Sequence, residues 1–131
     1  MTQTIAPSDA AIVFIGGGNM ARSLIGGLVA RGGDAASVRV VDPNPDTREA
    51  LARDFGVATY ADAAEAVAGA GTWVLATKPQ VMRSVCESLA GQARASRPLV
   101  MSVAAGITSD QLDRWLGGDA AVVRTMPNTP A

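Results

Sequence analysis

Three glycines at positions 16 to 18 directly follow a short apolar run, in the stretch IVFIGGGNMA. Gly16, Gly18 and Ala21 match the pattern G-x-G-x-x-G/A, which binds a dinucleotide pyrophosphate when it joins a strand to a helix. Gly16 permits the tight turn, Gly18 lets a phosphate approach the main chain, and Ala21 allows the helix to pack closely. Free N–H groups at the helix start then face the phosphates. The motif therefore predicts a site for NAD(H) or NADP(H) rather than an ordinary turn.

Polar residues follow the second apolar run. Asp42 comes about 20 residues after the glycine motif, where an acidic side chain accepts from the adenosine ribose and favours NAD(H). It also begins the stretch DPNPD, in which Asp is a common turn residue. Asn44, Thr47 and Arg48 lie close by and could hold a 2′-phosphate, which favours NADP(H). The sequence leaves the role of Asp42 and the choice of cofactor open.

Three later segments carry small, rigid or polar residues where strands are expected to end. Lys78 in ATKPQ precedes a proline that is expected to begin a helix. Its side chain places a positive charge at the carboxyl edge of the predicted sheet. Ala104, Ala105 and Gly106 leave space beside a flat ring. Asn128 lies in the proline-stiffened segment RTMPNTPA. Because ligands of open α/β sheets bind beyond the carboxyl ends of the strands, these segments predict a site for the nicotinamide ribose.

The apolar pattern supplies the elements that bring these residues together. Continuous apolar runs predict strands at 10–16, 37–42, 57–60, 72–78, 97–104 and 120–126. Such runs are typical of parallel strands covered by helices on both faces. Helical patterns lie between them, at 19–32, 46–55, 62–70, 79 to about 90, and in ITSDQLDRWLG with Thr108 or Ser109 as its cap. The predicted fold class is α/β, a Rossmann-type doubly wound parallel sheet of about six strands with helices on both faces.

Two helices have more detailed expectations. The helix at 19–32 places Met20, Leu24, Leu28 and Val29 near one face, and the helix at 46–55 is expected to be capped by Asp46. Residues 1–10 are expected to be a disordered or extended N-terminus, and residues 11–131 one NAD(P)-binding domain. A length of 131 residues and a hydrophobic content of 48% suit a single domain with a packed core.

Composition argues against several other classes of function. The net charge is −1 and no basic stripe is visible, so no nucleic-acid partner is expected. The chain has no histidine, so no metal site is predicted and Cys86 is interpreted as a buried apolar residue rather than a catalytic thiol. No apolar run is long enough to span a membrane and no signal peptide is recognised, so a cytoplasmic location is expected.

Four segments together resemble the N-terminal domain of the pyrroline-5-carboxylate reductases. FIGGGNMA, VLATKPQ, SVAAGIT and RTMPNTPA occur in the order and spacing of that family, and the resemblance covers about residues 11–131. It implies NADPH- or NADH-dependent reduction of 1-pyrroline-5-carboxylate to L-proline, the last step of proline biosynthesis. It also implies cofactor contacts from Phe14, Ile15, Gly16, Gly17, Gly18, Asn19 and Met20, from Asn44, from Ala76, Thr77, Lys78 and Pro79, and from Ala104, Ala105 and Gly106.

The sequence departs from the family in two respects. Many members carry a cofactor-binding Asn at the position that matches Ala63, so this contact is not expected here. Family chains also continue into a helical C-terminal domain that forms the dimer and supplies most substrate contacts. That domain is absent from these 131 residues, so the catalytic proton donor is left unassigned. Only Asn128 is expected to face the substrate. Cofactor binding without turnover is the expectation for this chain.

Two other functions fit parts of the pattern. A β-hydroxyacid-dehydrogenase-type reductase shares the first domain, but its opening usually reads G-x-M-G-x-x-M-A-x-N-L, whereas this chain has GGGNMARSLIGG. A non-catalytic NAD(P)-sensing module would bind the dinucleotide without needing the MPNTPA segment. A sensor should have a closed surface, whereas a cofactor domain should expose an apolar face where its second domain packs.

Overall fold

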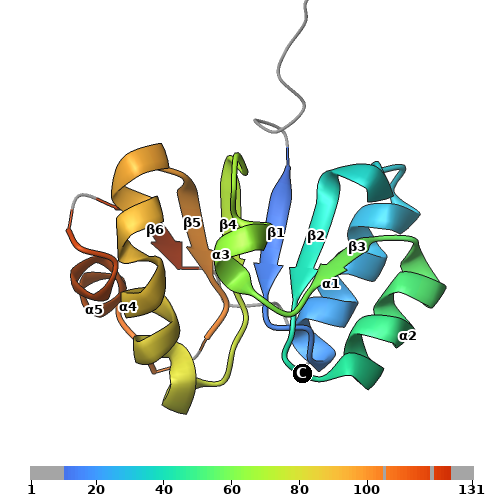
Figure 1. Cartoon of the computed structure of the whole chain (residues 1–131), viewed down its shortest axis with the longest axis horizontal. Coiled ribbons are helices and arrows are strands. Elements are labelled where there is room, and N and C mark those ends of the chain that lie inside the picture. The colour runs from blue at the N-terminus through green and yellow to red at the C-terminus, as the bar shows by residue number, and fades with distance from the viewer. Residues whose placement is uncertain (1–10, 105, 119, 125–131) are drawn as a thin grey trace, which may run out of the picture.

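Strands and helices alternate along the chain in the computed structural model, which describes residues 11–104, 106–118 and 120–124 (Figure 1). None of the helices in these ranges combines the length and the apolar character that a membrane crossing requires. The elements are β1 (Ile12–Ile15), α1 (Asn19–Ala30), the 3-10 turn η2 (Ala35–Ser37), β2 (Val38–Val41), α2 (Pro45–Phe55), β3 (Ala58–Tyr60), α3 (Ala63–Ala66), β4 (Thr72–Leu75), α4 (Pro79–Ser96), β5 (Leu99–Ser102), α5 (Ser109–Trp115) and β6 (Ala121–Arg124).

The six strands form one sheet in the order β3-β2-β1-β4-β5-β6, and every neighbouring pair is parallel. The chain winds outward from β1 to β3 and then crosses back to place β4 on the other side of β1. This reversal between β1 and β4 is the topological switch point of a Rossmann-type fold. The predicted fold class is therefore confirmed.

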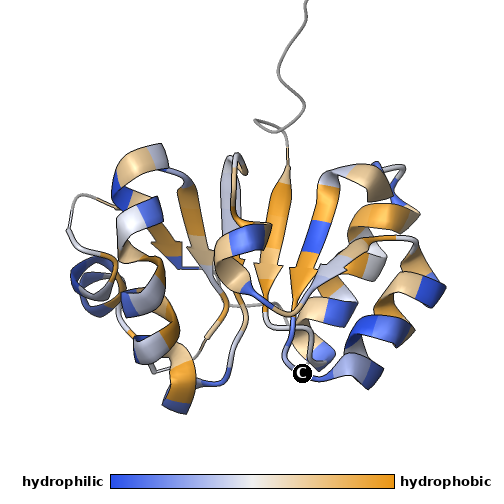
Figure 2. Cartoon of the chain, in the orientation of Figure 1, coloured by the Kyte–Doolittle hydropathy of each residue, from blue (hydrophilic) through white to orange (hydrophobic). Residues whose placement is uncertain are grey.

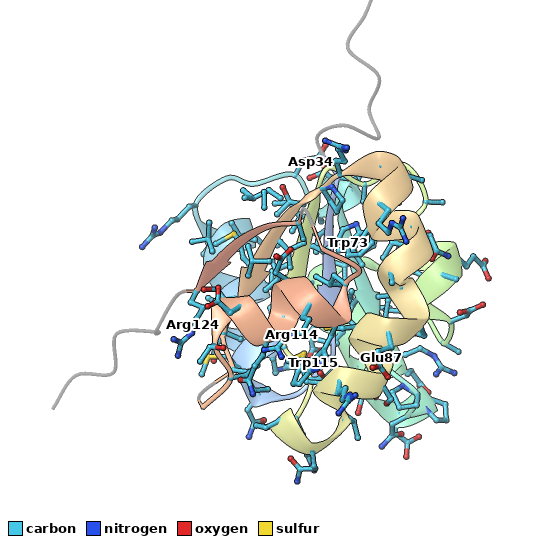
Figure 3. All side chains as sticks on the ribbon, turned by 90° about the vertical axis from the view of Figure 1, so that its left-hand side faces the viewer. Asp34, Trp73, Glu87, Arg114, Trp115 and Arg124 are labelled. Carbon is cyan, nitrogen blue, oxygen red and sulfur yellow. The ribbon has the colours of Figure 1, made fainter. Side chains whose placement is uncertain are left out.

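Alternate residues of the strands enter two separate apolar layers, as the two-residue period of a strand requires. Phe14 and Val40 face α1 and α2, while Trp73, Leu75 and Val100 face α3, α4 and α5. Figure 2 shows strands that are largely hydrophobic and helices in which hydrophilic and hydrophobic residues are mixed. Figure 3 shows Trp73 among the side chains of the interior, and it is fully buried. Helices therefore lie on both faces of the sheet, as predicted.

Only part of the apolar surface of helix α1 packs against the sheet. Ala21 and Ile25 are its buried residues, while Met20 and Leu28 are exposed by 38% and 37%. The apolar stripe of α1 is wider than its contact with the sheet, and the short side chain of Ala21 allows the closest approach at its centre. Met20 and Leu28 therefore contribute little to the packing of α1 on the sheet.

Three other helix boundaries differ from the expectations. Helix α2 is capped by Asn44 rather than Asp46, because Pro45 occupies the first helical position and the Asn44 side chain accepts from the Asp46 N–H. Helix α4 continues past Ala90 to Ser96, because Leu89 and Ala93 both pack into the core. Helix α3 is a single turn, Ala63–Ala66, rather than a helix over 62–70.

Among the residues that the structure describes, no helix lies over one half of one sheet face. Helices α1 and α2 cover β1, β2 and β3, and the same face of β5 and β6 stays open. Four of the five large apolar side chains exposed in the described ranges lie on α1 or on this open face: Met20, Leu28, Leu99 and Val123. A hollow of about 440 Å³ lies between α1 and β5, and Leu24, Leu28, Met101 and Val103 are among its lining residues. We call this region the open apolar face.

Candidate cofactor site at the carboxyl edge of the sheet

The carboxyl ends of the central strands lie level with one another. Parallel pairing is in register along β1, β2, β4 and β5, so the loops that follow these strands leave the sheet side by side. The main-chain ladder extends one residue further, through hydrogen bonds from Gly16 N to Val41 O (2.8 Å), Ala76 N to Ile15 O (2.9 Å) and Val103 N to Leu75 O (3.2 Å). This edge therefore gathers most of the predicted site residues in one place.

The glycine loop is held tightly by its neighbours. Gly16 has a φ of +109°, and a Cβ on it would lie 2.7 Å from the Ala76 carbonyl oxygen. A Cβ on Gly17 would lie 2.9 Å from Leu51 Cδ1 and 3.2 Å from Thr47 Cγ2 of α2. At Gly16 the backbone conformation and the space both require glycine, since L-residues rarely adopt a positive φ. The loop therefore packs against the ATKP turn on one side and α2 on the other.

Gly18 differs from Gly16 and Gly17 because the position that a Cβ would occupy is open space. A Cβ on Gly18 would meet no atom of the described residues within 4 Å. Gly18 is the N-cap of α1 and provides no side-chain hydrogen bond, and the first turn of α1 contains no acidic residue. The first N–H groups of α1 are therefore free to bind an anion at the positive end of the helix dipole. An open glycine beside an uncapped helix start fits a pyrophosphate group.

Asp42 and Asn44 organise the turn that follows β2. Asp42 Oδ2 accepts from the Gly17 N–H at 2.9 Å, and its Oδ1 accepts from the Asn44 N–H at 2.8 Å. Arg48 Nη1 donates to the Asp42 carbonyl oxygen at 2.7 Å. Asn44 Oδ1 accepts from the Asp46 N–H at 2.9 Å, so its amide NH₂ remains available at this edge. These contacts make Asp42 a turn former. They bring Arg48 and Asn44 close to the glycine loop.

The turns after β4 and β5 form the other end of the edge. Lys78 is the N-cap of α4, is exposed, and forms no ion pair with any residue in the described ranges. The Ala104 N–H donates to Ser102 Oγ at 3.2 Å, and Ser102 is 1% exposed. Gly106 has a φ of +80°. Ser102 was not expected at this site, although a hydroxyl residue at the end of an apolar strand was a usable signal for it.

Several predicted site residues reach this edge only through their main chain, or lie outside the described ranges. The side chains of Phe14 and Ile15 are each 2% exposed and enter opposite apolar layers. Ala105 and Asn128 lie outside the described residues.

Cys86 is fully buried in α4, and burial raises the pKa of its thiol to about 12, so it is inert at neutral pH.

The switch-point position of the glycine loop and the uncapped start of α1 define a Rossmann-type dinucleotide-binding domain. The family model described as NADP oxidoreductase, coenzyme F420-dependent, matches residues 11–106. The chain belongs to this family.

Proteins of known name resemble the chain over most of its length. Pyrroline-5-carboxylate reductases from Pseudomonas aeruginosa and Escherichia coli are 49% and 40% identical to it over 120 and 121 residues, which are 92% of this chain. A solved pyrroline-5-carboxylate reductase from Coxiella burnetii superposes with a TM-score of 0.89 at 39% identity, and covers 92% of this chain. The resemblance inferred from the four motifs is confirmed. The chain spans only 44%, 45% and 45% of these three proteins, which is less than half of each.

Proposed function

We propose that this chain is the cofactor-binding part of an NAD(P)H-dependent pyrroline-5-carboxylate reductase. The reaction converts 1-pyrroline-5-carboxylate, NAD(P)H and a proton into L-proline and NAD(P)⁺. The observation that carries the proposal is the glycine loop at the switch point, with Gly18 open to solvent beside an uncapped helix start. The 49% identity to the Pseudomonas aeruginosa reductase supports this substrate.

Each end of the carboxyl edge has a separate task in this proposal. When bound, the cofactor supplies the hydride that reduces the C=N bond. The start of α1 holds the pyrophosphate, and the turn at Asn44 and Arg48 lies beside the adenosine ribose. Lys78 and the turn at Ala104 lie at the other end, where they orient the nicotinamide ribose. Asn128, which lies outside the described residues, is assigned to the substrate in this proposal.

We propose further that the open apolar face is covered by another part of the protein, the substrate-binding and dimer-forming domain expected from the resemblance. A doubly wound sheet is normally covered on both faces. Large exposed apolar patches on soluble proteins usually mark such contacts. The length of the relatives, of which this chain spans less than half, supports the same assignment.

The cytoplasmic location stays a prediction.

The two other functions receive less support. Solved dehydrogenases with different substrates share the fold, among them a prephenate dehydrogenase from A. aeolicus with a TM-score of 0.76 at 17% identity. Such a likeness reflects the fold alone and does not favour a hydroxyacid substrate. The open apolar face argues against a self-contained sensor module, because a sensor should have a closed surface.

Calorimetric titration of the 131-residue chain with NADPH and with NADH, beside an assay of 1-pyrroline-5-carboxylate reduction, tests the proposal. We expect cofactor binding without turnover, because most of the substrate contacts are expected from the other domain. Absence of binding to either dinucleotide would refute the cofactor site. Turnover by this chain alone would refute the proposal that catalysis requires both the cofactor-binding domain and the substrate-binding domain.

A further inference from the structure

Asp42 uses all of its polar groups within the protein. Its N–H donates to the Tyr60 carbonyl at 3.0 Å, and its own carbonyl accepts from Arg48 Nη1 at 2.7 Å. Its two carboxylate oxygens accept from different loops, Oδ2 from the Gly17 N–H at 2.9 Å and Oδ1 from the Asn44 N–H at 2.8 Å. The side chain therefore ties the glycine loop after β1 to the turn after β2.

We propose that Asp42 is a positioning residue that holds the glycine loop in its binding conformation and so increases affinity for NADH and NADPH alike. This inference rests on the proposed function of the chain as a cofactor domain. It differs from the role that an acidic residue after the second strand usually takes, which is to accept from the adenosine ribose and to discriminate against a 2′-phosphate.

The surroundings of Gly17 favour the positioning role. Gly17 is buried, and a Cβ on it would already lie 3.3 Å from Asp42 Oδ2. If the carboxylate turned away toward a ribose, the buried Gly17 N–H would lose its partner, and leaving such a donor unsatisfied is unfavourable. Hydrogen bonds to a carboxylate are also stronger than neutral ones. The Gly17 N–H therefore favours the present orientation of the carboxylate over one turned toward a ribose.

A fixed loop matters for affinity because glycines are flexible. Gly16, Gly17 and Gly18 are consecutive, and glycine loses more conformational freedom on ordering than any other residue. A loop that is ordered before the ligand arrives avoids that loss on binding. The benefit arises at the pyrophosphate, which NADH and NADPH share, so it does not depend on the 2′-substituent.

Asp42→Asn is the test variant because it is nearly isosteric. The amide has one acceptor oxygen and one NH₂ donor, so it cannot accept from the Gly17 and Asn44 N–H groups together. Asp46→Asn is the matched control, since Asp46 lies in the first turn of α2 and is exposed. It removes the same charge nearby without touching the glycine loop. Thermal unfolding of both variants checks that they remain folded.

Two quantities are measured on the 131-residue chain: the dissociation constants for NADH and NADPH, and the hydrogen exchange of the Gly17 amide without cofactor. We expect Asp42→Asn to weaken both dinucleotides about tenfold, with their ratio unchanged within about twofold, and to speed Gly17 exchange. We expect Asp46→Asn to change neither quantity.

Weaker NADH binding with equal or tighter NADPH binding would overturn the proposal, because it is the signature of a ribose ligand. Unchanged affinity for both dinucleotides in folded Asp42→Asn would overturn it as well. Either result would leave the proposed function standing, because the unsubstituted chain would still bind cofactor. If the unsubstituted chain bound neither dinucleotide, the proposed function would fail and this inference with it.

Discussion

Gly16→Ala should destabilise the fold, and the size of the effect follows from the geometry of the glycine loop. The substitution forces a residue with a Cβ to adopt a φ of +109°, which costs about 1–3 kcal/mol. The new Cβ would also lie within 3.0 Å of three main-chain atoms of Ala76 and Thr77. These main-chain atoms cannot move away easily, because the Ala76 N–H donates a hydrogen bond to the Ile15 carbonyl oxygen of β1. We therefore expect a loss of about 2–4 kcal/mol in the free energy of unfolding.

Gly18→Ala should affect stability less than Gly16→Ala and should mainly weaken cofactor binding. A Cβ on Gly18 meets no atom of the described residues within 4 Å and its φ is −74°, which alanine adopts readily. We expect a loss of about 1 kcal/mol in the free energy of unfolding, because alanine is a poorer N-cap than glycine, and this is less than the loss expected for Gly16→Ala. The added methyl group projects into the space assigned to the pyrophosphate, so NADPH and NADH should bind about tenfold more weakly, a difference of about 1.4 kcal/mol.

Urea unfolding followed by circular dichroism and calorimetric titration with NADPH measure the two effects on the same preparations. Gly91→Ala is a control for Gly18→Ala, because it adds a methyl group to open space on α4, far from the glycine loop. It should alter neither cofactor binding nor, by more than about 1 kcal/mol, stability. Normal stability of Gly16→Ala would refute the assigned turn. Normal affinity of Gly18→Ala would refute the phosphate site.

Three further predictions concern residues outside the glycine loop. Because Cys86 is buried with its thiol pKa raised to about 12, iodoacetamide at pH 8 should label it far more slowly in the folded chain than in urea; equal rates would contradict its burial. The Arg22 guanidinium, by hydrogen bonding, holds the pKa of Asp54 below its usual value of 3.8. This pair therefore stabilises the fold above that value and loses its effect as the pH falls through the lowered pKa. Asp54→Asn should accordingly lower the urea midpoint at pH 7 and reduce its fall towards pH 2, and parallel pH profiles for the two proteins would contradict this. Thr108 and Gln111 form a reciprocal capping box on α5, so Thr108→Ala should cost about 1 kcal/mol in urea unfolding, and an unchanged midpoint would show that the cap contributes nothing.

The strands and their parallel arrangement could be predicted because their physical cause is local. Apolar runs such as IVFI in β1 and WVL in β4 have no polar face, and burying them requires helices on both faces of the sheet. The glycine loop was likewise predictable, since its spacing encodes a strand–turn–helix geometry. The helix that passes through Gly91 was not, because packing of Leu89 and Ala93 on either side outweighs the low helix propensity of one glycine.

The details of the site depended on contacts that no local pattern contains. Asn44 and Asp46 are both suitable helix caps, and only the position of Pro45 in the first turn decides between them. The two roles considered for Asp42 could not be separated either. Which N–H groups its carboxylate accepts from depends on how the loop after β1 approaches the turn after β2. How much of the apolar stripe of α1 the sheet covers could not be predicted either, because it depends on the width of the contact between them.

The position of β1 in the middle of the sheet has a consequence for synthesis on the ribosome. Strands β1, β2 and β3 with their two helices are made from the first 60 residues and pair with neighbours in sequence. The other edge of β1 has its partner only when β4, Thr72–Leu75, has emerged, because Ile12 pairs with Thr72. Until then the nascent chain presents a bare apolar strand edge, the kind of surface that chaperones shield. The junction where that edge finally closes, between Gly16 and Ala76, lies at the proposed cofactor site.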